Sequence, residues 1–169
     1  GVSSMTLTQA AQMIKKGGVI AYPTETFYGL ACDPHNKNAI KKIYQIKGRK
    51  SQKALSLIIS DTLQLKKWVQ SVNPQQKKLI STFWPGPLTL IFKAKKAILK
   101  DLIGHTQKIA LRIPSSITAQ HFARLSGGAI TATSANVSGK VAGSSPRQIS
   151  HMLGDQIDGI ISRGRLKPS

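Results

Sequence analysis

The chain has 169 residues, of which 40% are hydrophobic, and this length favours one globular domain. Its 25 Lys and Arg outnumber its 6 Asp and Glu, and the net charge of +19 predicts an anionic partner: nucleic acid, a nucleotide or anionic lipid. The alternative is that the lysines only solvate the surface. No apolar run approaches the ~18 residues of a membrane span, and the single cysteine excludes a disulfide framework. We therefore expect a cytoplasmic protein without membrane contact.

The first third of the chain alternates helical and extended patterns. A threonine cap and the stop Gly17-Gly18 bound the first helix, and Asn36 caps the second. Between them lies a strand-to-loop junction that contains Glu25, the only glutamate. The expected elements are a helix over Thr6–Lys16, a strand over Val19–Tyr22, the junction Pro23–Leu30, a helix from Asn36 through Lys47 and a strand over Leu55–Ile59.

The rest of the chain continues the alternation around one irregular excursion, and it predicts an α/β fold with a mixed sheet covered on both faces. The expected elements are a short helix capped by Asp61 and ending at Val69, a helix from Asn73-Pro74 to near Phe83, a rigid turn over Trp84–Pro87, a strand over Leu88–Lys93, an irregular stretch over Lys93–Lys108, a strand over Ile109–Ile113, a lead-in Pro114-Ser115-Ser116 to a helix through Leu125, strand Ala129–Thr133, a helix from Ser145-Pro146 through Leu153 and strand Gly159–Ser162.

The stretch Thr131–Gly139 is the first candidate binding element. Its strand runs into a loop of small, uncharged polar residues, namely Thr131, Thr133, Ser134, Asn136 and Ser138. Such a strand end leaves backbone N–H groups free and lets a ligand approach the main chain, which suits a phosphate or a carboxylate if cations come from elsewhere. The alternative is a polar turn after an edge strand.

Two groups of cations could complete such a site. Lys47, Arg49 and Lys53 follow the second helix, where the alternative is that they only complement the helix dipole. Arg112 interrupts an apolar strand and carries a guanidinium fork that fits carboxylate or phosphate, although an edge-strand arginine could also face water.

Phosphate-binding loops, a serine-nucleophile elbow and histidine ligand spacing are all missing from the sequence, so we expect no protein-bound metal.

Several segments together resemble the YrdC/TsaC family, the threonylcarbamoyl-adenylate synthases. The resemblance covers nearly the whole chain and rests on Tyr22-Pro23-Thr24-Glu25-Thr26, Tyr28-Gly29-Leu30, Lys47-Gly48-Arg49, Trp84–Thr89, Ala110-Leu111-Arg112 and Thr133–Gly139. It implies a single-domain, twisted mixed α/β sheet flanked by helices, with a basic concave face, over residues 1–169. It also implies a reaction in which L-threonine, bicarbonate or CO2, and ATP give threonylcarbamoyl-AMP and pyrophosphate.

The resemblance also implies roles for individual residues. ATP would be a substrate with Mg2+ carried on its phosphates, and tRNA and the downstream threonylcarbamoyl-transfer proteins would be partners. Thr26, Arg112 and Ala132 would bind threonine, with Arg112 on the carboxylate. The catalytic set would be Lys47, Arg49, Ser134 and Asn136, and the ATP contacts would be Lys47, Arg49, Lys53, Lys108, Thr133, Ser134, Asn136, Ser138 and Ala142.

The chain departs from the family pattern in two places. Longer members carry a histidine shortly after the K-x-R segment, where Ile58 stands here, and members continue with at least one more strand, so we expect residues 1–169 to lack the last one. Two other functions stay open. One is a non-catalytic module for double-stranded RNA or tRNA, and the other is a carbamoyl-adenylate site like that of the hydrogenase-maturation carbamoyltransferases.

Overall fold

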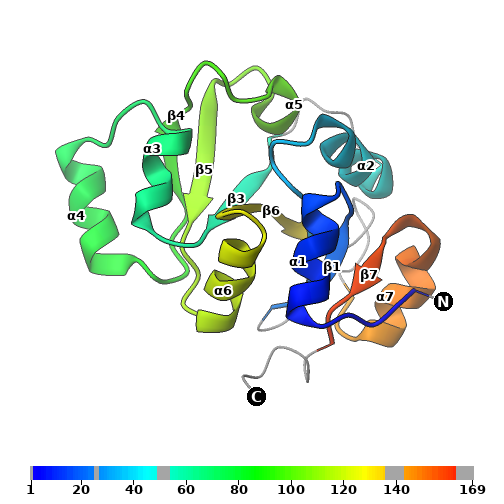
Figure 1. The fold of residues 1–169 in the computed structure, drawn as a ribbon. Coiled ribbons are helices and arrows are strands. Elements are labelled where there is room, and N and C mark those ends of the chain that lie inside the picture. Colours follow the sequence, from blue (N-terminus) through cyan, green and yellow to red (C-terminus); the bar gives the residue numbers. More distant parts are fainter. Residues whose placement is uncertain (1, 25–26, 49–53, 136–142, 163–169) are drawn as a thin grey trace.

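The computed structural model describes residues 2–24, 27–48, 54–135 and 143–162 (Figure 1). Their helices and strands alternate along the chain. In order they are α1 (Leu7–Lys15), β1 (Ile20–Pro23), β2 (Tyr28–Ala31), α2 (Lys37–Lys47), β3 (Ser56–Ile59), the 3-10 helix η1 (Thr62–Gln64), α3 (Leu65–Trp68), α4 (Pro74–Phe83), β4 (Leu90–Lys93), α5 (Lys100–Ile103), β5 (Lys108–Arg112), α6 (Ile117–Leu125), β6 (Ala129–Ser134), α7 (Pro146–Leu153), the 3-10 helix η2 (Gly154–Gln156) and β7 (Gly159–Ile160).

The strands of these residues form one mixed sheet in the order β4-β5-β3-β6-β2-β1-β7. The pairs β3/β5 and β1/β7 are parallel, and the other neighbours are antiparallel. This confirms the predicted α/β class and the mixed sheet. No helix in the described ranges is both long enough and apolar enough to cross a membrane.

The helix ends follow the signals in the sequence. Thr6 forms a capping box with Gln9 at the start of α1, and Asn36 accepts a hydrogen bond from the Ala39 amide at the start of α2. Gly48 ends α2 in the left-handed conformation, with φ at 68°, which a residue with a Cβ adopts only at a cost. The end of helix α2 at Lys47 is therefore determined by the local conformation of Gly48.

Three parts of the secondary structure differ from the prediction. The junction after β1 contains a full strand, β2, because it pairs with β1 on one side and β6 on the other, and this overrides the weak strand preference of Gly29. The irregular stretch contains α5, which buries Leu102 and Ile103. The helix expected after Asp61 is split into η1 and α3, and Asp61 caps η1.

Two helical layers cover the sheet, one on each face (Figure 1). Helices α1 and α6 lie together on one face, where Ile14 and Phe122 pack against apolar residues of β1, β2, β3 and β6. Helices α2, α3, α5 and α7 contribute to the core on the opposite face. We call the face under α1 and α6 the front face.

The helices α1 and α6 cover only part of the front face. Because alternate residues of a strand share a face, Ser56 and Ile58 of β3 both lie on the front, and the paired residues Ala132 and Ile130 of β6 lie beside them. Ile58 and Ile130 are buried under α6, whereas Ser56 and Ala132 are partly exposed. The front face is therefore open toward the start of β3 and the end of β6.

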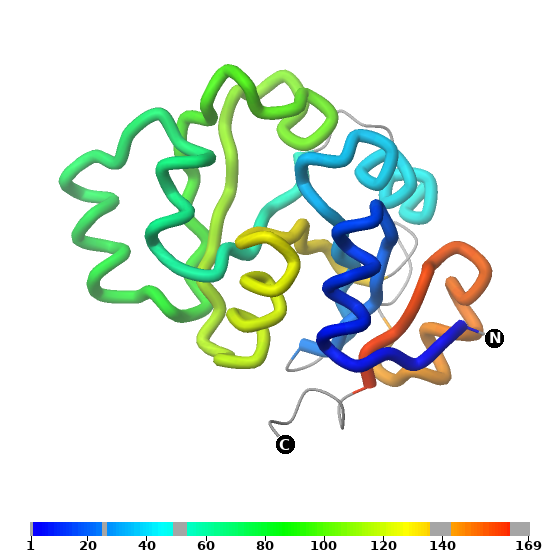
Figure 2. Tube along the Cα trace, viewed as in Figure 1, coloured from blue at the N-terminus to red at the C-terminus, as the bar shows by residue number. Residues whose placement is uncertain are grey.

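At the β7 edge the sheet is joined by the start of the chain, which runs beside β7 (Figure 2). The Met5 amide donates to the Ile160 carbonyl at 2.8 Å. Just before β7, the Asp158 carboxylate accepts hydrogen bonds from the Val19 amide and from Lys42 Nζ, both at 2.8 Å. One side chain thus joins the start of β1, helix α2 and the β7 edge.

Asp158→Ala should lower the free energy of unfolding by about 1–2 kcal/mol at pH 7, because it removes two charge-assisted hydrogen bonds from a partly exposed site. Burial alone would raise the pKa of Asp158, but the bonds from Lys42 and Val19 lower it overall. A lowered pKa stabilises the fold above the ordinary aspartate pKa of 3.8, and this stabilisation is lost as the pH falls through the folded-state pKa. Urea unfolding at several pH values measures this.

The matched control is Asp155→Ala, which removes an exposed carboxylate from η2. Its effect should stay within about 0.5 kcal/mol. Equal losses for the two variants would contradict the role given to Asp158.

Candidate functional site

A pocket of about 350 Å3 lies on the open part of the front face. Its floor is made of small residues, because Gly29, Ser56 and Ala132 occupy front positions on the three central strands β2, β3 and β6. Two large side chains flank this floor: Tyr22 comes from β1 on one side, and Arg112 comes from β5 on the other. The pocket is therefore a shallow trough across the strands, with space for a small ligand.

Arg112 ends β5 and is half-buried, level with Ile58 on the neighbouring strand. Within the described ranges, the three ion pairs all lie elsewhere and use Asp61, Asp101 and Asp158. No carboxylate among these residues pairs with the Arg112 guanidinium or lines the pocket. Its charge and its donors are thus available to an anionic ligand.

Lys47 brings a second cation to the end of β6. Only 2% of Lys47 is exposed, and its Nζ donates to the Ser134 carbonyl at 2.7 Å and to Ser134 Oγ at 3.1 Å. Lys47 therefore does more than complement the end of α2. It holds the last residue of β6 in place and puts positive charge behind the polar end of that strand.

Among the other predicted site residues, Ala132 and Thr133 line the pocket with Ser134. Lys108 does not line it. Extending the β3/β5 register by three residues and the β3/β6 register by two sets Lys108 level with Ser134 across β3, about 10 Å away in two strand spacings. A ligand would have to extend from the pocket along the front face to contact Lys108.

Six predicted residues lie outside the described ranges and stay predictions, namely Thr26, Arg49, Lys53, Asn136, Ser138 and Ala142.

The sequence pattern places Thr131 with the polar loop, and this prediction is wrong. It is fully buried on the face opposite the pocket, where Thr131 Oγ1 accepts from the Cys32 amide at 2.9 Å. Successive side chains of a strand point to opposite faces of the sheet. Ala132 and Ser134 lie on the pocket face of β6, so Thr131 points the other way, into the core. Burial raises the pKa of the Cys32 thiol to about 12, so this cysteine stays protonated and unreactive at neutral pH.

Sequence reasoning assigned no role to Tyr22, Gly29 or Ser56, although all three line the pocket. Tyr22 and Gly29 belong to the segments that resemble the family, and the pattern around Ser56 predicts only a buried strand. The signal in the sequence is a small residue on each of three strands, at the position that faces the front. That signal acquires meaning only once the strand order is known, because β2, β3 and β6 are distant in the chain and adjacent in the sheet.

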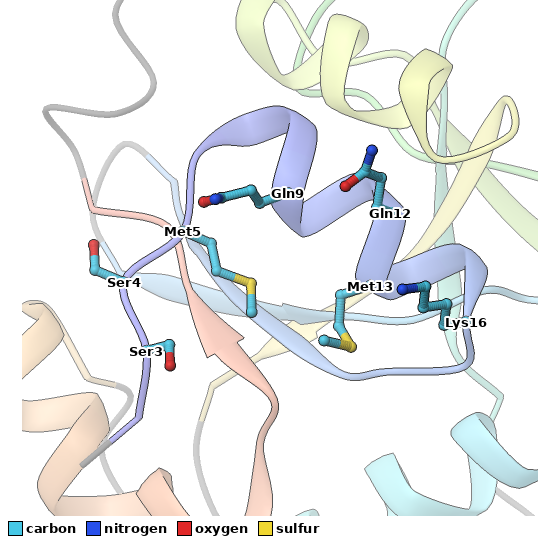
Figure 3. Close-up of a pocket in the computed structure, with 7 residues that line it drawn as sticks. All are labelled: Ser3, Ser4, Met5, Gln9, Gln12, Met13 and Lys16. Atoms are coloured by element: carbon cyan, nitrogen blue, oxygen red, sulfur yellow. The ribbon is translucent and has the colours of Figure 1, made fainter.

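Two other pockets contain none of the predicted site residues. One, of about 280 Å3, lies between the start of the chain and α1, where Met5 and Met13 face it together with polar side chains (Figure 3). The other, of about 580 Å3, is larger and is lined by Arg147, Gln148, Ser150 and His151 of α7. We assign the site to the pocket on the front face, since an available arginine and a polar strand end converge only there among these three.

The family model of Sua5, YciO and YrdC, described as telomere recombination, matches residues 12–169. The threonylcarbamoyl-AMP synthase of Methylobacillus flagellatus is 37% identical over 158 residues, which make up 92% of this chain and 88% of that protein. The threonylcarbamoyl-AMP synthase of Bacillus subtilis is 38% identical over 159 residues, which make up 94% of this chain and 46% of that protein.

Among solved structures, P. abyssi Sua5 complexed with L-threonine is similar, with a TM-score of 0.86 and 33% sequence identity. The match covers 92% of this chain and 46% of the Sua5 chain. The chain therefore spans most of the Methylobacillus protein but about half the length of the Bacillus and P. abyssi proteins.

The core position of Thr131 gives a prediction. Thr131→Val should lower the free energy of unfolding by about 1–3 kcal/mol, because it leaves the buried Cys32 amide without its acceptor. Thr133→Val, at a half-buried position that lines the pocket, should cost less. Urea unfolding of both variants measures this. An unchanged stability for Thr131→Val, together with weaker ligand binding, would return Thr131 to the site.

Proposed function

The chain belongs to the Sua5, YciO and YrdC family, and we propose that it is a threonylcarbamoyl-AMP synthase. The proposed reaction consumes L-threonine, bicarbonate or CO2, and ATP, and it releases pyrophosphate. The observation that carries the proposal is the pocket itself: Arg112 has no carboxylate partner among the described residues and faces the same trough as the strand end that Lys47 holds.

The threonine carboxylate would bind Arg112. A guanidinium binds a carboxylate through two parallel hydrogen bonds, which fixes the orientation of the amino acid as well as its position. The small residues Ser56 and Ala132 leave space for the backbone of an amino acid over the floor. Thr26 keeps its predicted role as a threonine contact, which rests on the sequence.

ATP would occupy the polar end of the front face, near Ser134 and toward Lys108. The threonine ammonium group would lose one proton, its nitrogen would attack the carbon of CO2, and the adduct would lose a second proton to solvent to give an N-carboxylate. An oxygen of that carboxylate would then attack the α-phosphorus while the bond to the β-phosphate oxygen breaks and pyrophosphate leaves. Negative charge grows on the phosphoryl oxygens and the leaving group, so positioned cations and N–H donors lower the barrier without a nucleophilic side chain.

In this scheme Lys47 supplies charge at the end of β6 and orients Ser134 toward the nucleotide. Arg49, Lys53, Asn136, Ser138 and Ala142 would complete the nucleotide contacts. Any Mg2+ would enter on the triphosphate, since no carboxylate among the described residues lines the pocket to hold it. The product would be consumed by proteins that transfer the threonylcarbamoyl group to adenosine 37 of tRNAs that read codons beginning with A, which places the proposed reaction in the cytoplasm.

The proposal predicts that pyrophosphate release from ATP requires both L-threonine and bicarbonate. Arg112→Gln should raise the threonine KM by at least about tenfold, because it removes a charge-assisted pair of hydrogen bonds. A coupled pyrophosphate assay measures both effects. Arg124→Gln is the matched control, because Arg124 lies on α6 and forms its ion pair with Asp61 away from the pocket.

Equal pyrophosphate release without threonine would overturn the proposal. If the protein instead bound double-stranded RNA with a steep salt dependence and bound neither ATP nor threonine, the chain would be the non-catalytic RNA module.

A further inference from the structure

We infer that the Tyr22 hydroxyl is a second hydrogen-bond donor to the amino-acid carboxylate, beside Arg112. The inference rests on the proposed function, since it concerns the ligand of the same pocket. It assigns a specific contact to the wall of the trough that faces Arg112, where sequence reasoning placed no functional residue.

Gly29 determines where the Tyr22 ring lies. The two residues are directly paired between β1 and β2, and a Cβ on Gly29 would be 3.0 Å from Tyr22 Cζ and 3.1 Å from its hydroxyl oxygen. The ring therefore lies over the glycine, where any larger residue would push it away. This position carries the hydroxyl from β1 across β2 toward the middle of the pocket floor.

Phe122 of α6 fixes the ring in that position. The two ring centroids are 5.7 Å apart with an interplanar angle of 59°, and Tyr22 as a whole is only 4% exposed. Such tilted aromatic pairs are favourable and hold both rings in place. The hydroxyl is thus pre-positioned by packing that exists before a ligand binds.

The hydroxyl is in the right chemical state to donate. Burial raises the pKa of Tyr22 to about 12, and the nearby Arg112 guanidinium opposes part of that rise. The phenol therefore keeps its proton at neutral pH, and its tip lies within the electrostatic reach of Arg112. Among the described residues, no hydrogen bond uses this hydroxyl.

Neighbouring groups on the floor are less suited to the task. Ser56 Oγ already donates to the Ala132 carbonyl at 3.1 Å. Ile58, the residue level with Arg112 on β3, is apolar and offers no hydrogen bond. A carboxylate bound by Arg112 keeps lone pairs that need donors in a partly buried site, and the Tyr22 hydroxyl reaches toward it from the opposite side of the trough.

The test is isothermal titration of L-threonine into the full chain, wild type and Tyr22→Phe. Phenylalanine keeps the ring and its packing on Phe122 and removes only the hydroxyl. We expect the Kd for threonine to rise on the order of tenfold, as for the loss of a hydrogen bond to a charged group. Tyr44→Phe, a buried tyrosine of α2 on the opposite face of the sheet, should leave the Kd unchanged, and thermal unfolding should show all variants folded.

A second ligand, L-2-aminobutyrate, identifies the group that Tyr22 binds. It keeps the carboxylate and lacks the threonine hydroxyl, so the tenfold ratio between wild type and Tyr22→Phe should persist. A ratio that vanishes with this ligand would overturn the assignment to the carboxylate. An unchanged threonine Kd in folded Tyr22→Phe would overturn the inference alone, whereas a wild-type protein that binds no threonine would overturn the proposed function as well.

Discussion

The incomplete covering of one sheet face is the constraint on which the site depends. Helices α1 and α6 bury the front face at Ile58 and Ile130, and the strands continue beyond them with small residues. Covering the whole face would leave no room for a ligand, and large side chains on the central strands would fill the trough. Ser56 and Ala132 keep the floor open, Gly29 leaves space for the Tyr22 ring, and Tyr22 and Arg112 close the two sides of the trough.

The distribution of charge follows from the same arrangement. The three aspartates that form ion pairs in the described structure lie away from the pocket and act in the fold, as Asp158 does at the β7 edge. Arg112 forms no ion pair with a carboxylate of the described residues, so its charge is available to a ligand. Lys47 donates to the carbonyl and the hydroxyl of Ser134, the last residue of β6, and this places its positive charge at the polar end of that strand. A site of this kind suits reactants that are all anionic.

Much of the fold was predictable from local signals, such as the caps at Thr6 and Asn36 and the glycines after α1 and α2. Strand β2 was not predictable, because it is stabilised by pairing with β1 on one side and β6 on the other. The burial of Thr131 was not predictable either, because its hydroxyl oxygen accepts a hydrogen bond from the Cys32 amide within the core. The cations of the site were predictable from chemistry and from resemblance. The part played by Tyr22 and Gly29 was not, because it arises only from strand order and register.

The central claim is that the trough between Tyr22 and Arg112 is the amino-acid site of this chain. A crystal structure of the protein with L-threonine tests it most directly. The account predicts the threonine carboxylate within hydrogen-bonding distance of the Arg112 guanidinium, over the floor formed by Ser56 and Ala132. Threonine bound beside α7 or α1, with the trough empty at saturating ligand, would contradict it.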